Sequence, residues 1–316
     1  MPGTARDAWP ELPYAAWKDT RTTLHLWTQI VGKIRLACTP WLNHSWHVPL
    51  YVTTRGLTTS VIPRGERSFS IDFDFIEEAV IIDVSDGASS EIALEPRTVA
   101  DFHAEIMAAL RELGIPVRIH ETPNEIADGI PFSRDTVHRA YDGEQARRFW
   151  LALLQVERVF AQFRTGFLGK SSPVHFFWGS FDLAVTRFSG RRAPVHPGVV
   201  PHLPQAVLRE AYSHELSSAG FWPGGSGIEY AAFYSYAYPE PAGFRTAPVR
   251  PKAAFYEAAL GEFLLPYDAV RTAKDPEREL LLFLDATYGA AADAGSWDRS
   301  VLECEPGRPG MPRRVS

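Results

Sequence analysis

The side chains best suited to proton transfer gather between residues 169 and 222 of this chain of 316 residues. Acid–base chemistry near neutral pH uses imidazole and carboxyl groups, and this stretch offers four candidates: His175, Asp182, His214 and Glu215. His214 and Glu215 are neighbours in sequence, so their side chains need not point in the same direction. Structural hydrogen bonding is the alternative role, and the spacing does not choose between the two.

A second group of residues in the same stretch could bind a ligand. Guanidinium groups match the oxygens of carboxylates and phosphates, and a small anion-binding corner could form from Arg187, Arg191, Arg192 and His196. Aromatic walls could come from Trp178 and Trp222 and, further along the chain, from Tyr236. The segment therefore favours a small polar or anionic ligand, with ordinary ion pairs as the alternative role of the arginines.

Two geometric points stay open at the level of sequence. Asp182 and Arg187 fall on opposite faces of an unbroken strand, but a turn at residues 179–181 would reset the alternation and could bring them together. Tyr236 belongs to a predicted strand, residues 229–238, that has tyrosines along one face. Because each buried hydroxyl needs a partner, that face suits either a polar pocket wall or an interface.

Two motif-like patterns do not support the chemistry they suggest. Residues 166–172 contain Gly-Lys-Ser, but a phosphate-binding loop needs four residues between its glycines and lies between a strand and a helix. Here Gly166 and Gly169 lie closer together and follow a predicted helix. His44 and His47 have no acidic or cysteine neighbour to complete a metal site. We expect no metal centre, and the sequence indicates no particular cofactor.

Composition narrows the possible partners. The formal net charge of −6 is spread without blocks of like charge, which disfavours nucleic acid because phosphate binding needs concentrated lysine and arginine. No apolar run reaches the length of a membrane-spanning helix, and the first residues contain no apolar signal-peptide core. The cysteines, Cys38 and Cys304, are far apart and are expected to be free thiols. We predict a cytoplasmic protein with no membrane partner, and the oligomeric state stays undetermined.

The elements that must position these side chains follow from hydrophobic periodicity. Apolar residues at three- and four-residue steps predict helices at 14–36, 98–113, 144–168 and 276–293. Alternation predicts strands at 47–54, 57–62, 68–75, 79–85 and 229–238, the third of them with phenylalanines on one face and aspartates on the other. The fold class is therefore α+β, with two halves that each contain an antiparallel meander flanked by helices.

The two halves show weak internal similarity. The string VHFFWGS begins as HVPLYVT does, and GEFLLPYDAV is similar to SEIALEPRTV at a larger offset. An internal duplication would then require an insertion in the second half at about residues 189–227. We predict a first half at 1–138, a second half at 139–303 and a disordered tail at 304–316. Long insertions in compact domains are often functional, which favours a pocket where this segment covers its sheet.

Five long strings add a resemblance to a known family. The chain resembles a bacterial family catalogued as domain of unknown function 5996, through WPELPYAAWKDTRTTLHLWTQIVGKIRLA, NHSWHVPLYVTTRGLTT, SPVHFFWGSFDLAVTRFSGRRAPVHPG, REAYSHELSSAGFWPG and FYSYAYPEP. The resemblance spans about residues 9–303. It implies one complete module, but it implies no activity and no catalytic residue.

Two functions of different kinds follow. The first is a small-molecule-binding protein or enzyme that holds a small polar or anionic ligand in a pocket of the second half. The alternative is a non-catalytic interaction or scaffold protein whose aromatic surface is a subunit interface. A concave pocket containing at least two of the acid–base or arginine candidates would favour the first, and a large exposed aromatic patch would favour the second.

Overall fold

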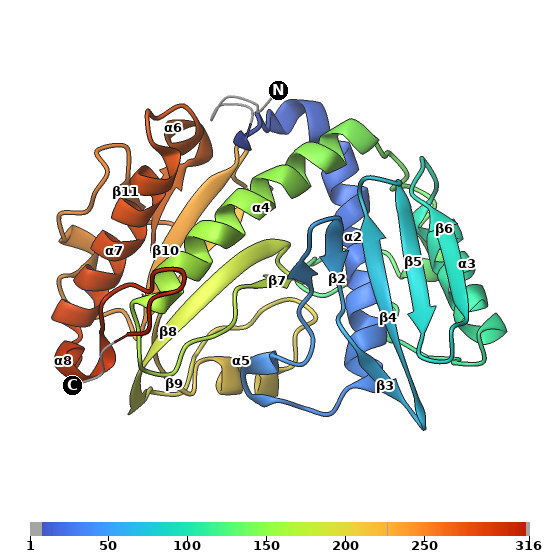
Figure 1. The fold of residues 1–316 in the computed structure, drawn as a ribbon, viewed down its shortest axis with the longest axis horizontal. Coiled ribbons are helices and arrows are strands. Elements are labelled where there is room, and N and C mark those ends of the chain that lie inside the picture. The colour runs from blue at the N-terminus through green and yellow to red at the C-terminus, as the bar shows by residue number, and fades with distance from the viewer. Residues whose placement is uncertain (1–7, 226, 314–316) are drawn as a thin grey trace.

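The computed structural model describes residues 8–225 and 227–313 and confirms the α+β class, with two antiparallel sheets of six strands each and helices packed against them (Figure 1). In the first half the sheet order is β1-β2-β4-β5-β6, and β3 pairs with β4. The elements of this half are α2 (Tyr14–Cys38), η1 (Asn43–Ser45), β1 (Tyr51–Val52), β2 (Gly56–Thr58), β3 (Ile62–Arg64), β4 (Arg67–Asp74), β5 (Ala79–Val84), β6 (Ser89–Ala93) and α3 (Val99–Glu112).

The second half begins after a connector that includes η2 (Phe132–Arg134). Its sheet has the order β7-β8-β9-β10-β12-β11. The elements are α4 (Gly143–Thr165), β7 (His175–Phe177), β8 (Asp182–Arg192), α5 (Gln205–Ala211), β9 (His214–Trp222), β10 (Ala232–Tyr238), η3 (Phe244–Thr246), β11 (Phe255–Glu257), β12 (Glu262–Pro266), α6 (Tyr267–Arg271), α7 (Pro276–Ala294) and α8 (Arg299–Leu302).

The segment predicted as an insertion contributes strands to the sheet, because residues 189–192 belong to β8 and residues 214–222 form β9. β9 lies between β8 and β10 and pairs with both. Residues 193–213, which include α5, form the long excursion outside the strands. His214 begins β9, and the short helix before it, α5, ends at Ala211. The order helix, meander, helix does occur in both halves, and a duplication stays a prediction.

The two sheets meet at a single antiparallel bridge. The Leu50 amide donates to the Phe176 carbonyl (2.9 Å), and the Phe176 amide donates back to Leu50 (2.8 Å). β1 and β7 thereby adjoin at the centre of the molecule. This junction brings the chain just before β1 beside the β7–β8 hairpin, which matters for the site below.

Helix α2 is the central element, and it is buried on all sides from Thr23 to Arg35. In Figure 1 it runs behind β4. Trp27 stacks on Phe102 of α3 with ring centroids 4.8 Å apart, and Trp17 contacts Phe149 of α4 at 5.1 Å. A helix packed all round tolerates polar residues only where each finds a partner. The polar side chains of α2 therefore indicate which segments are hydrogen-bonded to the helix.

Helix α4 crosses in front of β8 (Figure 1) and covers one face of the second sheet. β8 alternates: Arg187 points to α4 and donates to the Phe163 carbonyl, whereas Asp182, Ala184 and Thr186 point to the other face. Of the two alternatives that the sequence left open for Asp182 and Arg187, the one with the residues on opposite faces of the strand is observed. The 179–181 turn precedes β8, so both residues lie within one unbroken strand and on opposite faces.

The segment predicted as a disordered tail has a defined path as far as residue 313. The Cys304 amide donates to the Gly166 carbonyl (3.2 Å), and the Gly307 amide donates to Thr165 Oγ1 (2.8 Å). These bonds satisfy orphan groups at the C-terminal end of α4, which gives this short polar segment a reason to stay in place. Residues 314–316 lie outside the described part of the chain.

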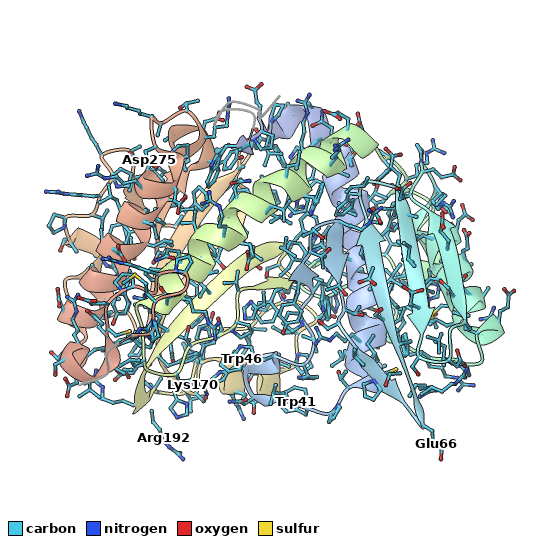
Figure 2. The ribbon with its side chains drawn as sticks, in the orientation of Figure 1. Trp41, Trp46, Glu66, Lys170, Arg192 and Asp275 are labelled. Atoms are coloured by element: carbon cyan, nitrogen blue, oxygen red, sulfur yellow. The ribbon has the colours of Figure 1, made fainter. Side chains whose placement is uncertain are left out.

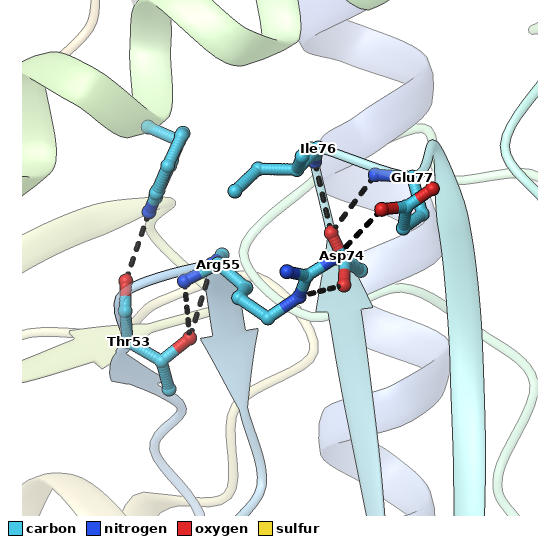
Figure 3. A network of polar contacts seen from close by, with 7 residues as sticks. Thr53, Arg55, Asp74, Ile76 and Glu77 are labelled. Atoms are coloured by element: carbon cyan, nitrogen blue, oxygen red, sulfur yellow. Dashed lines mark hydrogen bonds and ion pairs between the residues drawn. The ribbon is translucent and has the colours of Figure 1, made fainter.

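A polar network ties the turns of the first sheet together (Figure 3). Buried Asp74 accepts hydrogen bonds from the amides of Ile76 (2.9 Å) and Glu77 (3.0 Å) and pairs with Arg55. Thr53 accepts from the Arg55 amide (3.2 Å). The β1–β2 and β4–β5 turns are thereby fixed to each other.

We predict that Asp74→Ala destabilises the protein by about 2 kcal/mol, because it leaves two backbone amides and a guanidinium without their acceptor. Urea denaturation followed by circular dichroism measures the loss. Asp83→Ala is the matched control, since Asp83 is an exposed aspartate of β5. Equal stability of the two variants would contradict the role given to Asp74.

Candidate functional site

A cavity of about 360 Å³ lies on the face of the second sheet that is turned away from α4. Its floor is formed by β7, β8, β9 and β10. Its walls come from residues 41–48 of the first half, from the connector at 124–125, and from residues 200–212. Most of the lining is apolar, and the end beside the β7–β8 hairpin, which holds the carboxyl groups of Glu125 and Asp182, is called the polar end.

The first functional group at the polar end is Asp182, which is 4% exposed. Its carboxylate accepts hydrogen bonds from the Ser180 hydroxyl and from the Tyr234 hydroxyl. Burial raises the pKa of Asp182, and the two hydroxyl donors counteract part of that effect. Tyr234 reaches across β9 because Gly220 opposite it has no side chain, and a Cβ there would overlap the phenol ring.

The second group is Glu125, which lies in the connector between the halves. Its backbone has a positive φ of 63°, a conformation that costs energy in a residue with a Cβ. The Glu125 amide donates to the Pro201 carbonyl (2.9 Å). Its carboxyl group lies over Gly179, where a Cβ would overlap it. Burial, and then the nearby charge of Asp182, raises the pKa of Glu125 to about 7.

Polar residues of α2 at four-residue steps hold this end of the cavity in place. Gln29 accepts from the Asn124 amide (2.7 Å) and donates to the Asn124 carbonyl (2.9 Å). Lys33 donates to the Thr122 carbonyl at 2.8 Å, and His25 Nε2 lies 2.8 Å from the Gly179 carbonyl. Both the connector and the hairpin are therefore anchored to the same buried helix.

Aromatic side chains surround the two carboxyl groups. His175 is 1% exposed, its Nδ1 has no hydrogen-bond partner among the described residues, and burial lowers its pKa to about 4. Trp178 Nε1 donates to the Val48 carbonyl (2.8 Å). Val48 lies close to the β1–β7 bridge, so this hydrogen bond fixes the position of the indole. The hydroxyls of Tyr236 and Tyr212 lie 3.2 Å apart. With its lowered pKa, His175 is neutral at physiological pH.

Two segments close over the opposite end of the cavity: a first arm at residues 41–48 and a second arm at residues 200–212. Trp41, from the first arm, donates to Glu210 on α5 (2.6 Å), and His44 Nδ1 lies 3.2 Å from the Ala211 carbonyl. Lys170 Nζ lies 2.6 Å from His44 Nε2. Figure 2 shows Trp41, Trp46 and Lys170 along this edge of the molecule. The cavity is thus covered by segments from both halves.

Comparison with known proteins identifies the family. The model of the family of unknown function DUF5996 matches residues 9–304, nearly the whole chain. The chain belongs to DUF5996. A search of curated proteins and a search of solved structures found no match to it.

Two further absences concern the described part of this DUF5996 protein. Residues 8–225 and 227–313 include no helix long and apolar enough to cross a membrane. Within the same ranges, no group of three or more histidine, cysteine, aspartate or glutamate side chains is arranged to hold a metal ion.

Some residues singled out from the sequence line the cavity and others do not. The lining includes His175, Trp178, Asp182 and Tyr236. Arg187 lies on the far side of the sheet, where its guanidinium stacks on Phe163, 3.5 Å from the ring centroid. Arg187 lies on a strand, as the sequence predicted. Its side chain points towards α4 and not into the cavity, because successive residues of a strand face opposite sides of the sheet.

The remaining candidates lie around the cavity without lining it. Arg191 pairs with Glu215 (2.6 Å), and exposed Arg192 extends into solvent (Figure 2). His214 contacts Ser213 Oγ at 3.0 Å. The other two candidates stack on tyrosines of the lining: His196 on Tyr212 (4.2 Å) and Trp222 on Tyr234 (4.5 Å). The expected anion-binding corner is therefore not assembled, because its arginines point in three different directions.

Sequence reasoning did not select Glu125 or Tyr234 as site residues, and it considered His44 only as a metal ligand. Glu125 lies in a polar connector that suggests only a domain boundary, and His44 lies in a short turn. One available signal for Tyr234 was its place on the tyrosine face of β10. Backbone strain marks the site more clearly: His44, Ser45, Glu125 and Phe181 all have positive φ and lie in its walls or beside them.

Proposed function

We propose that this protein binds a small molecule in the cavity between the second sheet and the two arms. The supporting observation is the cavity itself: about 360 Å³, apolar along most of its wall and polar at one end. Ligand sites in proteins have this volume and this combination of surfaces. His175 and Asp182 both lie on its lining, which favours ligand binding over a scaffold role.

Acid–base catalysis on the bound molecule is compatible with the same geometry. Glu125, with a pKa of about 7, could accept or donate a proton near neutral pH, while Asp182 is held by two hydroxyl donors. Two carboxyl groups in different environments allow different roles. The proposal leaves the reaction open and commits only to binding.

The scaffold alternative has less support. The exposed aromatic side chains among the described residues, Trp41, Tyr230 and Phe255, come from separate segments and form no continuous strand face. A cytoplasmic location and an origin of the halves by duplication remain proposals. The matching order of elements in the two halves supports the second of these.

We predict that Ala184→Phe abolishes ligand binding. Ala184 lies on the cavity floor and is 3% exposed, so a phenyl ring there fills the space a ligand would occupy. A thermal-shift screen of a metabolite library against the wild type identifies ligands, which stabilise by about 3 kcal/mol at a hundredfold excess over Kd. Val61→Phe, at an exposed position, is the control. Ligands that shift Ala184→Phe as strongly as the wild type would place binding elsewhere.

A further inference from the structure

The charge of the cavity lining has one sign. Glu125 and Asp182 supply two carboxyl groups, and no lysine or arginine is among the lining residues. Two lysines of neighbouring segments have partners other than the carboxyl groups: Lys33 donates to the Thr122 carbonyl, and Lys170 contacts His44. An anionic ligand group would meet two carboxyl groups there without a compensating charge, which is unfavourable in a partly dry site.

Some hydrogen-bonding atoms at this end of the cavity have no partner among the described residues. Asp182 accepts from Ser180 and Tyr234, whereas the Glu125 carboxyl group accepts no hydrogen bond from the described side chains or backbone. His175, almost fully buried in the cavity lining, has its Nδ1 without a partner. The oxygens of Glu125 are therefore acceptors without a donor among the described residues. A ligand that supplies N–H groups would complete the site.

The position of Glu125 is imposed by the fold rather than chosen by the side chain. Its left-handed backbone, the Gln29 bonds to Asn124, and the missing side chain at Gly179 together direct the carboxyl group to the hairpin. Holding a carboxyl group near Asp182 is costly without a counter-charge. Strain maintained by several independent contacts is typical of a ligand clamp.

We propose that the ligand contains a cationic nitrogen, an amine or amidine, that binds between Glu125 and Asp182 and extends an apolar body along the cavity. This inference rests on the proposed binding function. The nitrogen donates to the free oxygens of Glu125 and supplies a positive charge that offsets the repulsion between the two carboxyl groups. Trp178 and Tyr236, which also line the cavity, present aromatic rings that suit both a cation and an apolar body.

The test compares ligands that differ only in charge. Tryptamine, indole-3-ethanol and indole-3-acetate share one apolar body, as do 2-phenylethylamine, 2-phenylethanol and phenylacetate. Isothermal titration calorimetry on the full-length protein at about pH 8 is expected to give amines at least about tenfold tighter binding than the alcohols, with carboxylates weakest. Glu125→Gln is expected to remove most of the amine preference, and Ala184→Phe to remove binding of every probe.

The affinity for amines is also expected to rise between about pH 6 and about pH 8, because proton and cation compete for Glu125. The other titratable groups around Glu125 are Asp182, Tyr212, His175, His25 from α2 and, beside Asp182, Glu262 from β12. Glu125→Gln therefore identifies the source of the dependence, since it leaves the others in place. A dependence that survives Glu125→Gln would overturn the role given to this residue.

The outcomes separate the two proposals. If the alcohols bind as tightly as the amines and Ala184→Phe still abolishes binding, the cation inference is wrong and the ligand cavity stands. If no amine binds, the inference is likewise overturned. If no compound of either the probe set or the metabolite library binds in a manner sensitive to Ala184→Phe, the proposed function fails as well.

Discussion

Replacing Glu125 with glutamine is expected to stabilise the protein by up to about 3 kcal/mol at alkaline pH. The folded state raises the pKa of this carboxyl group to about 7, from an ordinary value of 4.5. A raised pKa means that the folded state binds the proton more tightly than the unfolded state does. The wild type therefore loses stability as the pH rises from 4.5 through about 7, and the amide, which cannot ionise, avoids that loss.

Thermal unfolding at a series of pH values measures this effect. The melting temperatures of wild type and Glu125→Gln should converge at acidic pH and separate as the pH rises past neutrality. Asp128→Asn is the matched control, because Asp128 is an exposed carboxylate of the same connector. A constant difference between wild type and Glu125→Gln across the whole range would show that ionisation of Glu125 is not its cause.

Substituting alanine for Gly32 is expected to cost about 3 kcal/mol, although alanine favours helices. Gly32 lies in the middle of α2, directly against the indole of Trp178, and a Cβ at this position would overlap the ring. The indole cannot move freely because its Nε1 donates to the Val48 carbonyl. The substitution must displace either the helix or the hairpin that forms the polar end of the cavity.

Gly289→Ala provides a matched control within the same protein. Gly289 is also inside a long helix, α7, but a Cβ there comes no closer than 4.0 Å to Arg299. Helix propensity alone then applies, and we expect a gain of about 0.5–1 kcal/mol. Chemical denaturation of both variants tests the argument. A gain for both, or a loss for both, would mean that the Trp178 contact does not decide the outcome at Gly32.

The fold class could be predicted from the sequence because its signals are local. Alternation along β4, three- and four-residue periodicity in α4, and the Asp-Pro start of α7 each depend only on nearby residues. The extent of the supposed insertion could not be predicted in this way. β9 reads as part of a polar, glycine-containing segment, and its place between β8 and β10 depends on pairing with strands distant in sequence.

The candidate site could likewise be predicted from the sequence only in part. The sequence alone indicated His175, Trp178, Asp182 and Tyr236, because chemically suitable side chains there share one stretch of β-strands. Only the tertiary structure decided that Glu125 meets Asp182, since the two are joined by anchoring to α2 and by no sequence pattern. The tertiary structure also decided that the Arg187 side chain faces α4 and not the cavity. Which face a residue occupies depends on where its strand begins, and β8 begins at Asp182. Residue type is encoded locally, but which side chains converge depends on packing between distant segments.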